Sequence, residues 1–415
     1  MIRVRAAVLV LLCAAGAGAP SARAQVAAGG EAARPLLLGS SDGVFAAFGE
    51  PAATRTGWVV FHATRDDGRE GIYASAGSPP VAVAETGTPM EDGRRVLRMQ
   101  RFGSRPTVND AFRCAFTVGF AEGMSAVVVS QGLGGKYEIV ADSREAFRDF
   151  GGAAAIGGGG QVVFRAEVDP PNHPDRSRFD PRKLADPGLV DHPERIPPPE
   201  RYTFDGRKPR FHAGLFRVRG GDLLELGNTQ AGLLDLADGF ALNESGSVAF
   251  RASRRPKNWS LMVAGAGGGA LAVAETGARY SSFGLPAIDP RGRVAFLAQE
   301  TGGDAAILRS RIGGGLPEVV ADASDGFVAF GPNVSIDDGG RVAFVGRRRG
   351  GREALYVATE KGSVRELFGA GDLVQRRPVA HLRLSNRAFA RPDRLALLAQ
   401  LEPDVEAIVM LHLPR

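Results

Sequence analysis

The sequence predicts an all-β protein, a seven-bladed β-propeller of four-stranded blades. Three observations predict it: a short phrase recurs along the chain, its period is near 48 residues, and the two ends carry complementary parts of the repeat. Composition agrees, because 56 Gly and 26 Pro in 415 residues suit many short strands joined by tight turns better than long helices. Apolar residues make up 44% of the chain, enough for a large core.

The first 24 residues have the layout of a secretory signal peptide. Arg3 and Arg5 give a positive start, residues 6–15 form an apolar run, and Ala22-Arg23-Ala24 supplies the small residues of a cleavage site. The alternative is an N-terminal helix of the fold. We expect an exported protein, periplasmic or secreted, with cell-surface association left open.

Charge and hydropathy exclude some partners. The three arginines of the predicted signal peptide account for three of the five formal positive charges, so the mature chain gives little reason to expect a nucleic-acid partner. The apolar run at residues 6–15 is too short for a stable membrane anchor, and no later segment reaches that length. We therefore predict no transmembrane segment.

The cysteines offer little chemistry. Cys13 would leave with the signal peptide, and Cys114 is then alone and cannot form an internal disulfide. Cys114 stands where other copies of the repeat carry Val, which predicts a small buried hydrophobic residue. The alternative is a nucleophile.

The repeat is clearest in the second half of the chain. Residues 243–250 read NESGSVAF, residues 289–296 read DPRGRVAF, and residues 337–344 read DDGGRVAF. Weaker copies cover 54–61, 109–116 and 157–164, and a degenerate one lies at 391–397. The last residues of the seven copies are Phe61, Phe116, Phe164, Phe250, Phe296, Phe344 and Leu397.

Each copy combines a turn with a strand. Asn or Asp favours the first position of a type I turn and Gly the fourth. The Val-Ala-Phe that follows is apolar on both faces, as in a strand that lies between two layers. We expect each aromatic residue, for example Phe296, to be buried between adjacent blades.

The spacing of the copies predicts propeller blades. Successive copies lie 46 to 55 residues apart, except for one gap of 86 that holds an insertion, and a propeller blade takes about 40–50 residues. Within one unit we place the inner strand at 333–337, the second at 341–346, the third at 353–359 and the outer strand at 363–368.

The chain ends predict closure of the ring. Residues 25–35 are expected to form a flexible segment, and residues 36–415 the propeller. Residues 36–49 resemble the outer-strand region at 319–331, whereas the last copy ends one strand short. Pairing residues 36–45 with 407–413 would complete the last blade and remove an open edge. Six or eight blades and an open β-solenoid are the alternatives.

These tandem copies resemble the NxxGxxAF repeat of bacterial exported proteins, the choice-of-anchor tandem repeat family. The resemblance covers essentially the whole mature chain and implies an uncharacterized exported protein. It implies no activity for any residue. Members of that family commonly end in a surface-anchoring tail, whereas this chain ends at Leu413-Pro414-Arg415 without an apolar tail.

Motifs of catalysis are not found in the sequence. It has no zinc-hydrolase helix motif, nucleophile elbow or phosphate-binding loop. The Gly runs at 157–160 and 265–269 fall at expected turns, and the Asp-x-x-Gly turns lack the spaced carboxylates of a calcium loop. We predict no catalytic residue, no cofactor and no metal site.

Carboxylates recur at the ends of the expected outer strands. Such a set could bind cations or sugar hydroxyls, but outer strands lie far from the axis, so capping of nearby turns is the favoured interpretation. The four residues are Glu85, Asp142, Glu275 and Asp322.

The insertion at residues 170–212 is the other unusual feature. It holds ten of the 26 prolines and three of the six histidines, and such long irregular loops are usually functional or disordered. We predict that it connects the second and third strands of its blade and borders any ligand site. Its candidate contacts are Arg201, Tyr202, Phe204, Arg207 and Arg210.

Together these features favour an exported, non-catalytic binding or interaction scaffold, whose ligand could be a glycan or a cell-envelope component. The alternative is a carbohydrate-active hydrolase or lyase, on fold analogy alone. Two acids within about 10 Å in the central channel would favour hydrolysis. Small apolar residues along the channel would favour the scaffold.

Overall fold

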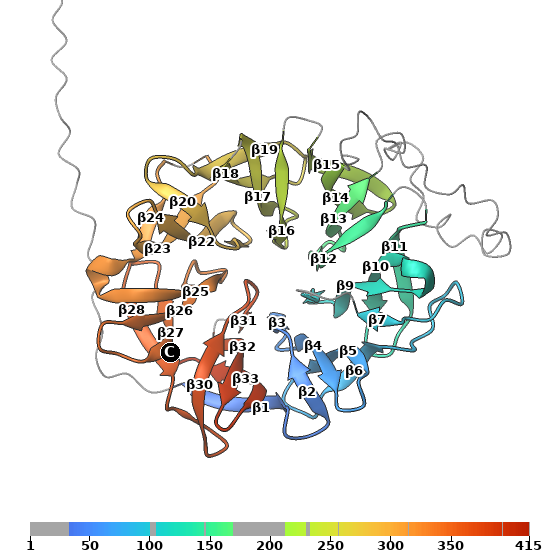
Figure 1. Cartoon of the computed structure of the whole chain (residues 1–415), viewed down its shortest axis with the longest axis horizontal. Coiled ribbons are helices and arrows are strands. Elements are labelled where there is room, and N and C mark those ends of the chain that lie inside the picture. Colours follow the sequence, from blue (N-terminus) through green and yellow to red (C-terminus); the bar gives the residue numbers. More distant parts are fainter. Residues whose placement is uncertain are drawn as a thin grey trace, which may run out of the picture.

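A computed structural model shows a closed ring of seven β-sheets arranged around a central axis (Figure 1). The structure describes residues 33–99, 105–144, 147–168, 212–229, 233–255, 257–313, 315–391 and 393–414. The predicted fold class, a seven-bladed β-propeller, is confirmed. The only helical turns in these residues are two single 3-10 turns, η1 (Ala121–Gly123) and η6 (Ala323–Asp325).

Blades 1 to 3 follow one another along the chain. Blade 1 contains β2 (Phe45–Phe48), β3 (Ala52–Ala53), β4 (Val59–Arg65), β5 (Glu70–Ser75) and β6 (Val81–Glu85). Blade 2 contains β7 (Arg98–Met99), β8 (Thr107–Val108), β9 (Arg113–Gly119), β10 (Ser125–Gln131) and β11 (Tyr137–Asp142). Blade 3 contains β12 (Asp149–Ile156), β13 (Val162–Val168), β14 (His212–Arg219) and β15 (Asp222–Asn228).

Blades 4 to 6 repeat this order. Blade 4 contains β16 (Asp235–Leu242), β17 (Val248–Arg255), β18 (Asn258–Ala264) and β19 (Ala270–Glu275). Blade 5 contains β20 (Tyr280–Phe283), β21 (Ala287–Ile288), β22 (Arg293–Glu300), β23 (Ala305–Arg311) and β24 (Glu318–Ala321). Blade 6 contains β25 (Phe327–Ile336), β26 (Val342–Arg348), β27 (Glu353–Ala358) and β28 (Val364–Gly369).

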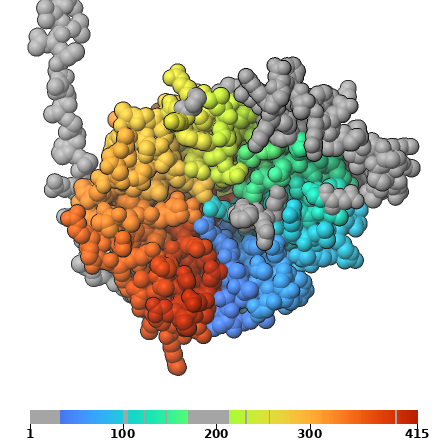
Figure 2. Space-filling view, in the orientation of Figure 1, coloured from blue at the N-terminus to red at the C-terminus, as the bar shows by residue number. Residues whose placement is uncertain are grey.

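Blade 7 is built from both ends of the chain. The C-terminal part supplies β29 (Leu373–Val374), β30 (Arg377–Arg383), β31 (Phe389–Arg391), β32 (Arg394–Leu401) and β33 (Val405–His412). The N-terminal strand β1 (Arg34–Ser40) pairs with β33 in antiparallel register, from Arg34 opposite His412 to Ser40 opposite Ala407. The first blade therefore lies directly against the last (Figure 2).

The predicted closing segment was partly wrong in its bounds. Pairing with β33 ends at Ser40, and Phe45 instead begins β2 and lies opposite Arg65 in blade 1. The reason is the turn at residues 41–44, which turns the chain from the outer strand of blade 7 toward the inner strand of blade 1. The strand also begins two residues before Leu36.

The core lies between the blades, in seven apolar clusters. Phe296 is fully buried and packs with Ala241, Leu261 and other residues of blade 4, and Phe344 packs likewise against blade 5. Phe250 packs against blade 3. The repeated aromatic residue of these blades therefore packs against the preceding blade. This confirms the predicted burial between adjacent blades for Phe250, Phe296 and Phe344.

The repeated turn also links neighbouring blades. Oδ1 of Asn243 accepts a 2.8 Å hydrogen bond from the Ser247 N–H within its own turn. Its Nδ2 donates 2.8 Å to the carbonyl oxygen of Asp289, the equivalent residue of the next blade. Asn109 donates in the same way to the carbonyl of Gly157, at 3.1 Å. An asparagine here therefore shapes the turn and joins two blades.

We name the two faces of the ring by their connections. The turn face carries the turns between the first and second strands of each blade. The opposite face carries the ends of β13 and β14, where Val168 lies opposite His212, and we call it the insertion face. Within β12, Ile156 lies at the turn face and Asp149 at the insertion face.

Cys114 and the outer-strand carboxylates have structural surroundings. Cys114 is fully buried, and burial raises the pKa of its thiol. Glu85 accepts a 2.6 Å hydrogen bond from the Tyr73 hydroxyl, and buried Asp142 binds Arg94 and Arg144.

The other two outer-strand carboxylates lie further round the ring. Asp322 accepts a 2.7 Å hydrogen bond from the Ser324 N–H and caps η6, whereas Glu275 ends β19 and is exposed. The contacts of Glu85, Asp142 and Asp322 are those of turn capping and ion pairing, not of one shared binding site.

Candidate functional site

A short segment of blade 7 closes the centre of the ring. Residues 384–388, which we call the plug, connect β30 to β31, and β31 lies near the axis (Figure 1). Leu384, Ser385 and Ala388 are buried. The plug follows the inner strand of the last blade, where the repeat is most degenerate in sequence.

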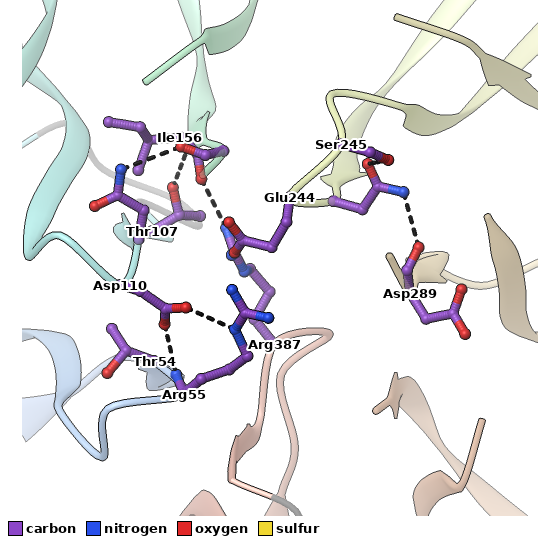
Figure 3. A network of polar contacts seen from close by, with 12 residues as sticks. Thr54, Arg55, Thr107, Asp110, Ile156, Glu244, Ser245, Asp289 and Arg387 are labelled. Carbon is purple, nitrogen blue, oxygen red and sulfur yellow. Dashed lines mark hydrogen bonds and ion pairs between the residues drawn. The ribbon is translucent and has the colours of Figure 1, made fainter. Parts of the chain in front are cut away.

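The plug reaches the opposite wall of the ring. Nδ2 of Asn386 donates to the carbonyl oxygens of Phe240 in blade 4 and Pro286 in blade 5, at 3.2 and 3.0 Å. The Arg387 guanidinium donates 3.0 Å to the carbonyl oxygen of Ile156 in blade 3 (Figure 3). These bonds cross the axis, because blades 3, 4 and 5 face blade 7 across the ring.

The plug is also fixed to its neighbours. Asn333 in blade 6 donates 2.8 Å to the carbonyl oxygen of Leu384, and the Ala388 N–H donates 3.1 Å to Ser335 Oγ. On the other side, the Ala53 N–H of blade 1 donates 2.9 Å to the carbonyl oxygen of Arg387. The segment thus binds blades 1, 3, 4, 5 and 6, and it closes the channel.

A cavity of about 400 Å³ lies above the plug at the turn face. Its floor is formed by Asn386 and Arg387, and six of the seven blades contribute to its walls. Much of the wall is apolar, from Ala53, Val108, Ala241, Leu242, Ile288, Ile336, Phe389 and Ala390. A closed floor, apolar walls and a few polar groups are the features of a small-ligand site.

Charged side chains at one position of the repeated turns form the rim. This is the second turn position, directly after the Asn or Asp. Arg55 occupies it in blade 1 and binds Asp110 of blade 2 through Nε at 2.6 Å (Figure 3). Arg55 also lies 3.5 Å from Asp338 of blade 6. Glu244 of blade 4 occupies the same turn position, and Asp337 and Arg341 of blade 6 also line the cavity.

Arg387 carries the charge on the cavity floor. Its guanidinium lies 3.4 Å from Glu244, and its side chain is 16% exposed. Burial lowers the pKa of Arg387, and the carboxylates of Glu244 and Asp110 oppose that shift. By contrast, the hydrogen bond to Asp110 raises the pKa of the half-exposed Arg55.

The carboxylates of the rim are arranged as ion pairs. Asp110 and Asp338 both contact Arg55, so they are close enough to meet the separation that two hydrolytic carboxyls need. One guanidinium, that of Arg55, therefore pairs with both carboxylates.

The site residues predicted from sequence are not tested. Arg201, Tyr202, Phe204, Arg207 and Arg210 lie outside the described residues. The strands that flank this segment, β13 and β14, are the second and third of blade 3. Their ends at Val168 and His212 lie on the insertion face, opposite the cavity.

The sequence did carry a signal for the rim, which the prediction missed. The second turn position is variable within the repeat, and it is charged in blades 1, 2, 4 and 6: Arg55, Asp110, Glu244 and Asp338. A variable charged position inside a constant turn marks side chains that the fold does not require. The plug has no such signal, because its partners are distant in sequence.

The described ranges contain no group of three or more His, Cys, Asp or Glu residues placed to hold a metal ion. Over the same ranges, no helix is long and apolar enough to cross a membrane.

These features define a β-propeller with one plugged channel. No protein-family model and no curated protein sequence matches this chain. Solved structures do match. A structure from a study of two prolyl endopeptidases is 11% identical with a TM-score of 0.51, covering 89% of this chain and 50% of that chain.

Two further structures have lower TM-scores. TolB from Acinetobacter baumannii is 13% identical with a TM-score of 0.40, covering 77% of this chain and 65% of that one. The β-propeller domain of the Trilobed protease from Pyrococcus furiosus is 9% identical with a TM-score of 0.48, covering 88% and 93%. This chain thus spans about half to two-thirds of the first structures it matches.

Proposed function

We propose that this chain is an exported, non-catalytic binding propeller whose ligand occupies the cavity at the turn face. The plug carries the proposal. Hydrogen bonds from five other blades hold Leu384–Ala388 in place, so the cavity is formed before any ligand arrives. A preformed site loses little entropy on binding.

The lining indicates the kind of ligand. Guanidinium and carboxylate groups at the rim, from Arg55, Asp338 and Glu244, can bind hydroxyl groups in pairs, while apolar walls contact a ring or chain. The volume suits a compact ligand, on the scale of about 300–1,000 Å³ for small-molecule sites. A glycan unit or another polar cell-envelope component fits these features.

Export rests on the N-terminal sequence pattern alone. Residues 1–24 lie outside the described residues, so the signal peptide stays a prediction, as does the resemblance to the NxxGxxAF repeat proteins. Expression of the full chain with N-terminal sequencing of the mature protein tests it. Cleavage before Gln25 supports export, whereas an intact Met1 in the cytoplasmic fraction contradicts it.

A binding screen tests the site. The purified protein is titrated with glycan fragments and envelope polymers, and binding is measured by calorimetry. Asp338→Asn and Arg55→Gln should weaken any cavity ligand at least tenfold. Asp304→Asn, the same chemical change in a turn of the insertion face, is the matched control and should have no effect. Equal affinity in all variants would place the ligand elsewhere.

The same titration distinguishes binding from hydrolysis. Each polymer is incubated with the protein and examined for new reducing ends or unsaturated products. We expect binding without turnover, because Arg55 pairs with both Asp110 and Asp338. Turnover that is lost in Asp110→Asn would establish the carbohydrate-active alternative instead.

A further inference from the structure

The channel carries a second group of charged residues, on the other side of the plug from the cavity. Six blades contribute to it. Its centre is Glu50, in the connection between β2 and β3, and Glu50 lies 3.3 Å from Arg105 of blade 2. Asn333 of blade 6 donates to both Glu50 oxygens, at 3.0 and 3.1 Å. The same Asn333 side chain binds the plug.

Three arginines from separate blades lie near this carboxylate or near one another: Arg105 and Arg383 act on Glu50, and Arg251 lies near Arg105. Arg105 comes from blade 2, Arg251 from blade 4 and Arg383 from blade 7, directly before the plug. Arg251 donates 2.7 Å to the carbonyl oxygen of Phe283 and 3.4 Å to that of Asp238. Its hydrogen-bond partners are thus neutral carbonyl groups, and the carboxylate of Asp238 stabilises its charge.

Blade 3 adds a fourth arginine, Arg165, on the same side of the plug. Arg165 lies 3.3 Å from Asp238, whose side chain is largely exposed. Among the described residues, four arginines therefore face two carboxylates, Glu50 and Asp238. Within the part of the chain that the structure describes, Nε of Arg165 and Nε of Arg251 are buried and have no hydrogen-bond partner.

Burial makes this arrangement costly without an added anion. Burial lowers the pKa of Arg251, and neighbouring Arg105 lowers it further. Burial also raises the pKa of Glu50, although Arg105 and Arg383 oppose that shift. Two guanidinium groups that repel each other, near the mostly buried Glu50 and the exposed Asp238, favour the uptake of a negative charge.

We propose that Arg105, Arg251 and Arg383 form an oxyanion-binding site at the insertion-face mouth of the channel, separate from the cavity at the turn face. Guanidinium groups bind planar and tetrahedral oxyanions through paired N–H donors, so a phosphate or carboxylate group is the class of ligand. This site does not depend on the proposed function, because the plug separates the two mouths.

Inorganic phosphate is the probe. Thermal unfolding and calorimetry are followed against phosphate, sulfate and acetate, with chloride at matched ionic strength as the reference. We expect a saturable rise in Tm with phosphate or sulfate beyond that with chloride, and a weaker one with acetate. A larger rise with acetate would indicate a carboxylate ligand, whereas no saturable rise with any of the three would overturn the proposal.

Variants locate the site. Arg251→Gln and Arg105→Gln should each weaken phosphate binding at least tenfold, whereas Arg311→Gln, an exposed arginine on an outer part of blade 5, should not. Circular dichroism checks folding. If Arg251→Gln does not fold, Arg105→Gln and Arg383→Gln decide, because both side chains are partly exposed. Unchanged affinity in the folded variants would overturn the proposal.

Discussion

The Asn386 side chain of blade 7 donates a 3.0 Å hydrogen bond to the carbonyl oxygen of Pro286 in blade 5, across the axis of the ring. A second bond joins the same nitrogen to the Phe240 carbonyl. Because these partners lie 100 and 146 residues away in sequence, the bonds form only when the ring is complete. They connect closure of the fold to the floor of the cavity.

Removing this donor should weaken the fold. Asn386→Ala leaves two carbonyl groups without their donor, and we expect a loss of about 1–3 kcal/mol in the free energy of unfolding. Asn386→Asp should cost at least as much, because it keeps the shape but places a carboxylate oxygen against both carbonyls. Denaturant unfolding measures both. Wild-type stability in Asn386→Asp would mean that the side chain is not a donor here.

The bond between neighbouring blades can be tested in the same way. Asn243→Asp keeps the oxygen that accepts the Ser247 N–H but loses the donor to the Asp289 carbonyl. We expect a loss of about 1–3 kcal/mol, because Asn243 is buried. Asn243→Ala removes both bonds and should cost more. Wild-type stability in Asn243→Asp would show that the link between blades adds nothing.

The boundary aromatic residues should carry a large share of stability. Phe296 is fully buried between blades 4 and 5, so Phe296→Ala should cost about 3–5 kcal/mol. Leu316→Ala is the control, because Leu316 is 93% exposed and should change little. A loss below about 1 kcal/mol for Phe296→Ala would contradict close packing at this boundary.

Closure by the N-terminal strand has its own test. Leu38 in β1 is buried against Met410 and other residues at the boundary of blades 7 and 1, whereas Leu36 of the same strand is partly exposed. Leu38→Asp should lower Tm and broaden the transition, and Leu36→Asp should have a much smaller effect. Equal effects would mean that β1 does not pack as described.

The half-buried His62 predicts a pH dependence. Burial lowers the pKa of His62, and Glu70 only partly offsets this. Below about pH 6.5 the unfolded chain therefore binds a proton that the folded protein does not, so stability falls as pH decreases through that value. In His62→Gln this part of the loss should disappear. Parallel stability curves from pH 7.5 to 5 would contradict the assignment.

Much of the fold could be predicted because its signals are local and repeated. The turn residues and Phe296-type aromatics recur at one spacing, and the complementary ends follow from the same repeat. The link between Asn243 and Asp289 could not be predicted in this way, since the sequence shows the turn but not the distance to the next blade. Local chemistry therefore predicts the blades, and packing between blades decides the rest.

Most of the candidate site could not be predicted from the sequence. The plug lies in the most degenerate copy, and Asn386 and Arg387 there match no motif. Their importance comes from the space at the axis, which seven blades define together. The insertion is unusual in composition because it is rich in proline. Its residues 169–211 lie outside the described structure. Glu50 and Arg105, which lie 3.3 Å apart, are likewise brought together only when the ring forms.

Hydrogen exchange of two backbone amides shows whether the plug closes the channel. The Ala53 N–H binds the Arg387 carbonyl, and the Ala388 N–H binds Ser335 Oγ, so both report whether the plug is in place. If the channel is closed, these amides should exchange as slowly as those of β32, such as Leu398. Exchange at the rate of exposed turns would show an open channel and contradict its closure by the plug.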